Sequence, residues 1–153
     1  MMSFTRHGFA LVCLLPAAYC LLLTAESAAE NQAARGLTVW DGIYTEAQAE
    51  RGRAAYQQSC VSCHREDLRG DSTSPSLVGE SFLFLWGDME VGELSGRIQK
   101  LMPPERPGSL PGQTYADIIT FILQRNAFPA GETELAADPG SQHILITATR
   151  PGR

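Results

Sequence analysis

Two cysteines followed by a histidine stand close together in the first half of the chain, in the run Cys60-Val61-Ser62-Cys63-His64. Thiols three residues apart can add across the two vinyl groups of one haem, and the adjacent histidine can then donate an imidazole nitrogen to the iron. The sequence therefore predicts one covalent haem c, attached through Cys60 and Cys63 and ligated by His64.

Three other kinds of site could use the same residues. A redox-active dithiol of the thioredoxin type requires a βαβ surround, which the pattern of this chain does not indicate. A zinc site requires a fourth ligand, and no convincing one stands near Cys60, Cys63 and His64. A structural disulfide across a two-residue gap would be strained. Haem attachment is therefore the interpretation that the sequence favours.

A haem iron held by one histidine can take a second axial ligand, and methionine is a common one. Met102 begins the run Met102-Pro103-Pro104, where the prolines end a predicted helix and stiffen the backbone. Met89 stands between two acidic residues, in a polar setting typical of the surface. We expect Met102 to be the second ligand, with Met89 and, more remotely, His143 as alternatives. A methionine that only fills the core is the simplest other explanation.

The helix expected before the motif covers residues 46–58. Thr45 and Gln48 have the spacing of a capping box at its start, and several alanines favour helix after it. Gly52 lies in the middle and disfavours a helix on propensity alone. It is therefore either tolerated at a cost or required because another helix crosses close to it.

The rest of the chain alternates between loops and helices. Residues 65–80 are rich in Gly, Ser, Asp and Pro and are expected to form a loop. Apolar spacing predicts helices over 81–86 and 90–101, and prolines make 102–112 an irregular loop. A last helix is predicted over 115–125, capped by Thr114 and Asp117.

The N-terminus has the order of a secretory signal peptide. A short basic start at Arg6 precedes an apolar run from Phe9 to Leu23, and small residues follow up to Ala29. The run is short for a membrane-spanning helix and contains Pro16. We therefore expect residues 1–29 to be cleaved and the protein to be periplasmic, with a retained membrane anchor as the alternative.

The charge of the chain gives no support for one class of function, nucleic-acid binding. The chain has 12 basic and 17 acidic residues, a net charge of −5, and loss of residues 1–29 removes one of each. The basic residues are scattered, so nucleic-acid binding has no support.

A chain of 153 residues indicates one domain. We expect a lead-in over 30–44, the domain over 45–135 and a tail over 136–153, whose apolar stretch at 144–146 could add a strand or pack against the body.

Several features, in this order, resemble the class I cytochromes c from about residue 40 to residue 135. Besides the cysteine motif, they are a helix with Gly52 and Tyr56, Pro75 followed by Leu77, Trp86, Met102-Pro103-Pro104, and a last helix with Tyr115. Asp41-Gly42-Ile43-Tyr44-Thr45 and Phe128-Pro129-Ala130-Gly131 are similar to small monohaem cytochromes that accompany quinoprotein (PQQ) alcohol dehydrogenases, or to their haem domains.

The resemblance implies an all-α class I cytochrome c fold around one haem, with the first and last helices crossing near Gly52. It implies that the carbonyl of Pro75 accepts a hydrogen bond from His64. Four residues would form the walls of the haem pocket: Leu77, Leu94, Ile98 and Leu101. Trp86 and Arg97 are candidate partners of a haem propionate, or else a core residue and a solvated charge.

The resemblance also implies a function. Histidine and methionine together leave no open position on the iron, so we expect an electron carrier and not an enzyme. The expected partners are redox proteins, with a quinoprotein dehydrogenase as donor and a terminal oxidase as acceptor. The alternatives are a haem-bearing subunit of a membrane or dehydrogenase complex and, if Met102 is not a ligand, a site that binds a small molecule. The family often has glycine after the motif histidine, where this chain has Arg65.

Overall fold

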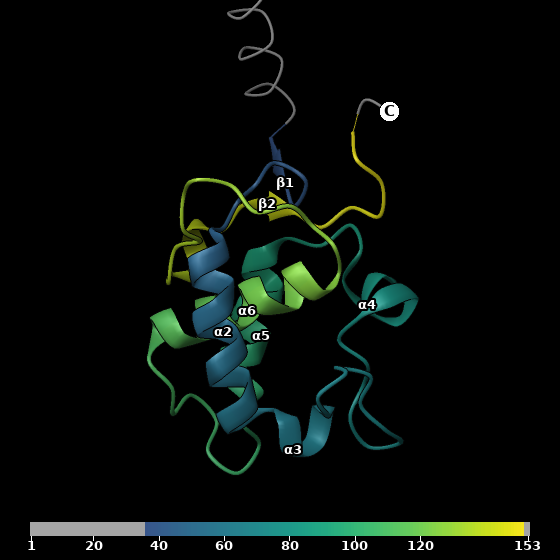
Figure 1. Cartoon of the computed structure of the whole chain (residues 1–153), viewed down its shortest axis with the longest axis vertical. Coiled ribbons are helices and arrows are strands. Elements are labelled where there is room, and N and C mark those ends of the chain that lie inside the picture. Colours follow the sequence, from purple (N-terminus) through teal and green to yellow (C-terminus); the bar gives the residue numbers. More distant parts are fainter. Residues whose placement is uncertain (1–35, 152–153) are drawn as a thin grey trace, which may run out of the picture. The chain divides into compact units, whose positions relative to one another are not determined.

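The computed structural model describes residues 36–151, which form a small all-α fold as the sequence predicted (Figure 1). The elements are β1 (Leu37–Thr38), α2 (Glu46–Ser59), α3 (Val61–His64), α4 (Gly79–Trp86), α5 (Val91–Leu101), α6 (Gly112–Arg125), the 3-10 helix η1 (Pro139–Ser141) and β2 (Ile144–Leu145). Among these residues no helix is long and apolar enough to cross a membrane. The predicted signal peptide, residues 1–29, lies outside the described residues.

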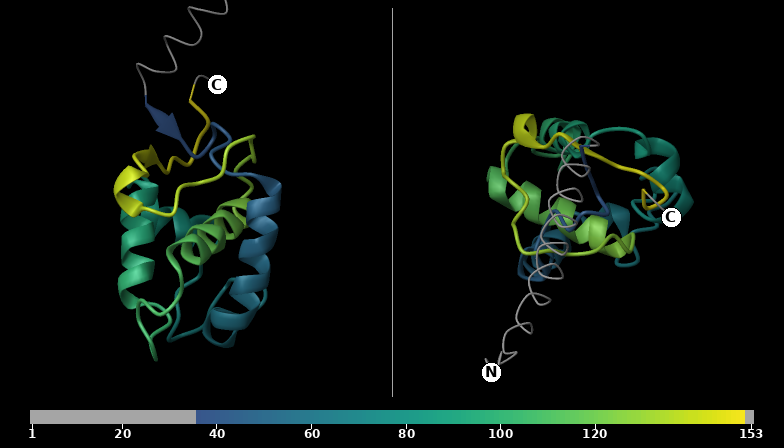
Figure 2. Two further views of the ribbon diagram at one scale, coloured as in Figure 1. Left: turned by 90° about the vertical axis from the view of Figure 1, so that its left-hand side faces the viewer. Right: turned by 90° about the horizontal axis from the view of Figure 1, so that it is seen from above.

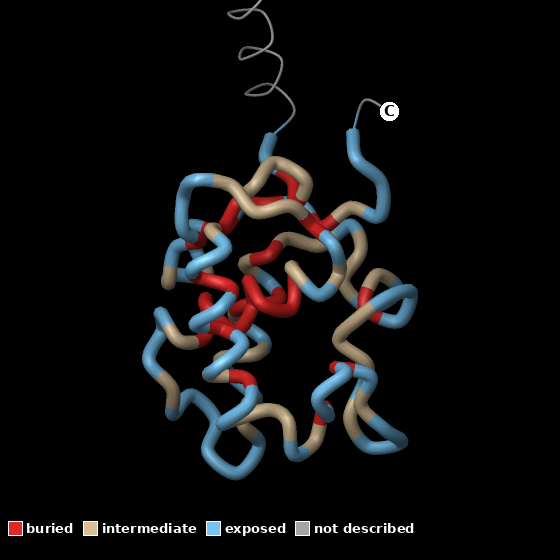
Figure 3. Tube along the Cα trace, in the orientation of Figure 1, coloured by how far each residue is buried: buried red, intermediate tan, exposed pale blue. Residues whose placement is uncertain are grey.

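The centre of the fold is the crossing of α2 and α6, where the buried residues gather (Figure 3). A Cβ atom at Gly52 would collide with the backbone carbonyl of Asp117, so the two helices approach too closely for any side chain there. One turn further along α2, the ring of Tyr56 lies 5.3 Å from that of Phe121. The structure therefore explains the glycine by the close helix crossing, the second of the two readings that its sequence position allowed.

The predicted caps of two helices differ from the structure, although the first of these helices begins at Glu46 as expected. The Thr45 hydroxyl accepts a hydrogen bond from the Gln48 amide, but the Gln48 side chain does not complete a capping box. Instead it is fully buried and exchanges two hydrogen bonds with the backbone of Leu135. The helix α6 begins at Gly112, after Pro111, so Thr114 and Asp117 lie inside it and do not cap it. At α2, a partner distant in sequence replaced the Gln48 half of the capping box. At α6, the helix begins directly after Pro111, before the expected cap.

The segment that the sequence left open between a strand and simple packing forms a strand. β2 pairs in parallel with β1, with Leu37 opposite Ile144 and Thr38 opposite Leu145. The indole Nε1 of Trp40 donates to the carbonyl of Thr147 at 3.0 Å. This short sheet lies at the end of the domain where α2 begins, whereas α3 lies at the other end (Figure 1, Figure 2). The last described residues therefore close over the end remote from the cysteine motif.

Candidate functional site

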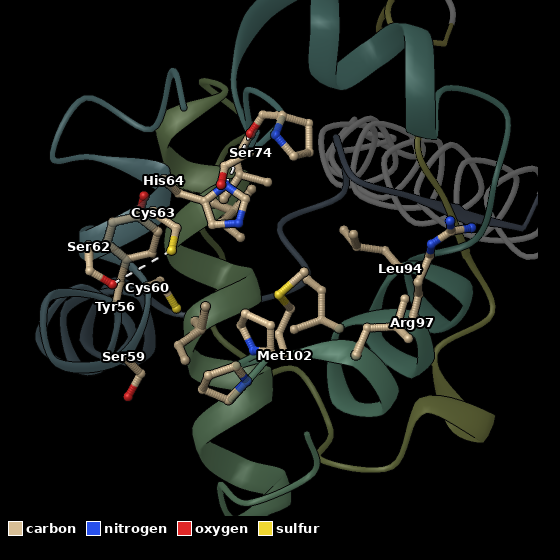
Figure 4. Close-up of a pocket in the computed structure, with 18 of the residues that line it drawn as sticks. Tyr56, Ser59, Cys60, Ser62, Cys63, His64, Ser74, Leu94, Arg97 and Met102 are labelled. Carbon is tan, nitrogen blue, oxygen red and sulfur yellow. Dashed lines mark hydrogen bonds between the residues drawn. The ribbon is translucent and has the colours of Figure 1, made fainter. Parts of the chain in front are cut away.

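A cavity of about 590 Å³ lies at the end of α2 where α3 begins (Figure 4). Its walls come from α2, α3, the loop after α3, α4, α5, the proline-rich loop and α6. The structure places all eight predicted site residues around it: Cys60, Cys63, His64, Pro75, Leu77, Trp86, Arg97 and Met102. Leu94, Ile98 and Leu101 also line it. The lining is mainly apolar, which suits a large flat organic group.

The two cysteines lie where α2 gives way to the single turn of α3. Both are free thiols and half-buried. Burial raises the pKa of the Cys60 thiol to about 11, and the nearby Cys63 adds to this shift. A redox-active dithiol needs a lowered thiol pKa, so this environment disfavours the thioredoxin-type alternative. Among the described residues no cluster of three or more His, Cys, Asp or Glu side chains could hold a metal ion, which disfavours the zinc alternative.

His64 is buried at the end of α3, and its ring points into the cavity (Figure 4). Its Nδ1 lies 3.0 Å from the carbonyl oxygen of Pro75. Because a carbonyl can only accept, Nδ1 must carry the proton and donate it. The other ring nitrogen, Nε2, therefore keeps its lone pair and is the nitrogen that can bind a metal.

The loop that carries Pro75 is held by its own backbone. Gly70 donates to the carbonyl of His64 at 3.1 Å, and Leu77 donates to the carbonyl of Leu68 at 2.8 Å. The carboxylate of Asp71 accepts hydrogen bonds from the amide and hydroxyl of Thr73 and from the amide of Ser74. These bonds lower the pKa of Asp71 to about 2. The turn thus fixes the residue directly before Pro75.

The two candidate methionines both line the cavity, whereas His143 does not. Met102 ends α5, and its thioether enters the cavity from the side of that helix (Figure 4). Met89 lies between α4 and α5. The ring of His143 is 75% exposed, and its Nδ1 lies 3.0 Å from the carboxylate of Glu90. The structure therefore leaves the methionines as the candidate second ligands.

The remaining predicted residues lie at one side of the cavity. The guanidinium carbon of Arg97 lies 6.0 Å from the centre of the Trp86 ring, at the limit of a cation–π contact. Arg97 is exposed and Trp86 is half-buried. Both can present N–H donors to an anionic group at the cavity mouth.

Sequence reasoning missed some of the lining. Ile118 and Ile122 of α6 line the cavity, although no sequence pattern marked them as site residues. Thr73 and Ser74 were seen only as loop residues. The run from Asp71 to Ser74 has the composition of a turn in which a side-chain carboxylate bonds the backbone two residues on, and that pattern could have placed them.

This set of donors fits a covalent haem. Two free thiols stand beside a histidine whose Nε2 is available, a methionine enters the same cavity, and most of the remaining wall is apolar. Residues 47–122 match the family model described as Cytochrome C oxidase, cbb3-type, subunit III. The matched segment has the class I cytochrome c fold. It begins in α2 and ends within α6, and so contains the whole cysteine motif. No curated protein and no solved structure matches the chain significantly.

A cytochrome c domain implies haem c and haem-based electron transfer. The haem, when bound, supplies an iron that alternates between the ferrous and ferric states. The residues of the cavity would offer thiols for its attachment, a histidine nitrogen for the iron and an apolar surround.

Proposed function

We propose that this protein is a periplasmic electron carrier with one haem c, attached through Cys60 and Cys63 and ligated by His64 and Met102. One observation carries the proposal: the junction of α2 with α3 and the C-terminal end of α5 bring these side chains to a single, mainly apolar cavity. With both axial positions taken by side chains, no position remains for a substrate, which suits electron transfer and disfavours catalysis.

The carbonyl of Pro75 holds the imidazole in one orientation and one tautomer in this proposal. By accepting the Nδ1 proton, it makes Nε2 the ligand and increases its basicity. The Asp71 turn and the backbone bonds of Gly70 and Leu77 keep that carbonyl in place. The histidine side of the iron is therefore preorganised by a loop that is itself hydrogen-bonded.

The apolar walls and the cavity mouth have different tasks. Leu77, Leu94 and Ile98 exclude water, and a low-dielectric surround together with a methionine ligand raises the reduction potential. Trp86 and Arg97 would donate hydrogen bonds to a propionate. An unbalanced propionate charge beside the iron favours the oxidised state, so its pairing with Arg97 also raises the potential.

The proposed partners are redox proteins, with a quinoprotein dehydrogenase as electron donor and a terminal oxidase as acceptor. The composition of the cavity mouth supports brief docking of such partners. Apart from the buried His64, Arg97 and Glu105 are the only acidic or basic residues among the described residues that line the cavity. Serine, threonine, proline and leucine form most of the exposed part of the lining. Electron-transfer encounters of this kind are typically small in area.

An optical experiment tests the proposal. We would mature the full chain with a cytochrome c assembly system and record oxidised and reduced spectra of the wild type, Met102→Ala and Met89→Ala. We expect covalent haem in all three, and a methionine-to-ferric-iron band that is absent only from Met102→Ala. Met89→Ala is the matched control because Met89 lines the same cavity.

The outcomes separate the parts of the proposal. A band that survives in Met102→Ala and disappears in Met89→Ala would make Met89 the ligand. The absence of covalent haem in the wild type would overturn the proposal as a whole and return Cys60 and Cys63 to a thiol or metal-site interpretation.

A second candidate function is a haem-bearing subunit of a membrane or dehydrogenase complex. The name of the matching family, which is that of an oxidase subunit, favours it. Fractionation of the native host cells decides between the two. A free carrier elutes from size-exclusion chromatography of the soluble fraction at the mass of one chain. A subunit stays with a larger haem-containing assembly in the detergent-solubilised membranes.

A further inference from the structure

The proline-rich loop that begins at Met102 is tied at both ends to one side chain. The hydroxyl of Tyr115, in the first turn of α6, donates to the carbonyl of Met102 at 2.7 Å. The same hydroxyl accepts a hydrogen bond from the amide of Leu110 at 3.4 Å. Tyr115 is only 2% exposed, so the contact is shielded from water. One buried hydroxyl thus joins the start of the loop to its end.

The loop has few other means of holding its shape. Four of its residues, Pro103, Pro104, Pro107 and Pro111, have no amide hydrogen to donate. Its internal backbone bonds run from Arg106 to the carbonyl of Pro103 and from Ser109 to that of Arg106, and so connect the loop only to itself. Residues 104–109 are exposed. The Tyr115 hydroxyl therefore has an unusual share in fastening this loop to the helical body.

We propose that Tyr115 is the positioning residue of the methionine ligand. Its hydrogen bond fixes the carbonyl of Met102 and with it the backbone from which the thioether reaches the iron. Without that bond the residue at the end of α5 keeps only its amide bond to the carbonyl of Ile98. The inference rests on the proposed function, in particular on Met102 as the second ligand.

A hydrogen bond of this kind has a modest net effect, because water competes for both partners once it is broken. Its loss should therefore weaken the methionine ligand without abolishing it. An added ligand such as imidazole must displace the methionine before it can bind the ferric iron. A looser methionine lowers the free energy of that displacement, so we expect imidazole to bind Tyr115→Phe about fivefold more tightly than the wild type.

The chain offers a matched control at Tyr44. Its hydroxyl donates to the carbonyl of Phe128 at 2.6 Å, and the residue is fully buried, but it does not line the cavity. Tyr44→Phe and Tyr115→Phe thus remove the same group and the same kind of hydrogen bond. A general loss of stability would affect both variants, whereas a weakened ligand would affect only the second.

The experiment is an imidazole titration of the ferric holoprotein, followed by the loss of the methionine-to-iron band, in the wild type and both variants. Denaturant midpoints are measured alongside. We expect both midpoints to fall and the imidazole dissociation constant to fall only in Tyr115→Phe. An unchanged dissociation constant in Tyr115→Phe, or an equal change in Tyr44→Phe, would overturn the positioning role. A wild type that lacks the band, or a Met102→Ala variant that keeps it, would overturn the proposed ligand and this inference with it.

Discussion

The middle and the C-terminal end of helix α2 are built in opposite ways. Near its middle, Gly52 lies against the backbone of α6 with no space for a side chain, and the residues of α6 from Tyr115 to Leu123 are all buried. At its C-terminal end, the same helix opens on a cavity of about 590 Å³. One region is stabilised by contacts within the protein, and the other contains the site proposed for the haem.

The lining of the cavity shows how much depends on its contents. Apolar surface contributes to stability when it is removed from water, at about 25 cal/mol per Å². Most of the lining of this cavity is apolar, so that contribution is made there only when a ligand covers the lining. The cavity end is therefore expected to order fully only when it is filled, while the helix crossing does not depend on a cofactor in this direct way.

The largest effect on haem content and folding should follow from removing both thiols that are proposed to attach the haem. In Cys60→Ala/Cys63→Ala we expect no haem to remain with the chain in denaturing electrophoresis and the cooperative thermal transition to be lost. Any helix that persists should be in α2 and α6, because their contact involves neither thiol. Hydrogen exchange measures this by region. Equal protection of the loop 65–80 and of α6 in the double variant would show that the cavity end does not depend on the haem more than the helix crossing does.

The next largest effect, on the free energy of unfolding, tests the crossing of α2 and α6. Gly52→Val places a branched side chain against the Asp117 carbonyl, and we expect the free energy of unfolding to fall by about 3 kcal/mol or more. Chemical denaturation of the holoprotein measures it. Gly96→Ala in α5 is the control, since a Cβ there meets nothing within 4 Å. It should raise stability by about 0.5–1 kcal/mol through helix propensity. Similar effects at both glycines would show that the crossing is not tight.

A smaller effect on stability is expected next to His64, the proposed haem ligand. Arg65 has φ 63° and ψ 166°, a conformation that side chains with a Cβ adopt only under strain. Arg65→Gly should therefore raise the free energy of unfolding by about 1 kcal/mol, the released strain being partly offset by the greater freedom of glycine in the unfolded chain. Arg65→Ala keeps the strain and loses the weak ion pair with Asp71, so it should not stabilise. Denaturant midpoints of the two variants distinguish these outcomes.

The smallest effect concerns pH. The pKa of Asp71 is lowered from its ordinary value of 3.8 to about 2, chiefly by hydrogen bonds from Thr73, so its contribution to stability exists above pH 4. That contribution is lost as the pH falls from about 4 to about 2. The stability difference between the wild type and Asp71→Asn should therefore be constant above pH 4 and shrink below it. Denaturant titrations at stepped pH measure the difference, and one that grows on acidification would contradict the assignment.

The sequence predicted best where chemistry or local pattern decides the outcome. The cysteine motif, the loop over 65–80 and the helices α2, α4 and α5 depend on neighbouring residues, and the structure has all of them close to the expected bounds. Gly52 was also informative, because a glycine inside a helix needs a reason. All eight predicted site residues line one cavity, since a pocket of this kind draws on motifs that can be recognised singly.

What the sequence could not predict depends on distant partners. The side chain of Gln48 bonds Leu135, 87 positions away, and Asp117 bonds Arg51, 66 positions away. Each of these residues also fitted a local cap, and no local pattern reveals that a stronger partner exists elsewhere. The double contact of the Tyr115 hydroxyl could not be predicted for a different reason: its partners are backbone groups of the preceding irregular loop, and no sequence pattern gives the course of that loop.

The β1–β2 pairing has a consequence for the order of events in time. It joins the first and last described elements, and the nearby bond from Trp40 to Thr147 closes a stretch of 107 positions. A contact that closes a long loop costs conformational entropy, which its hydrogen bonds and packing must offset. A sheet with two residues in each strand makes few such interactions. We therefore expect the chain to assemble its helices first and to bring its two ends together last. The same ends would part first during unfolding, while the helices are still in place.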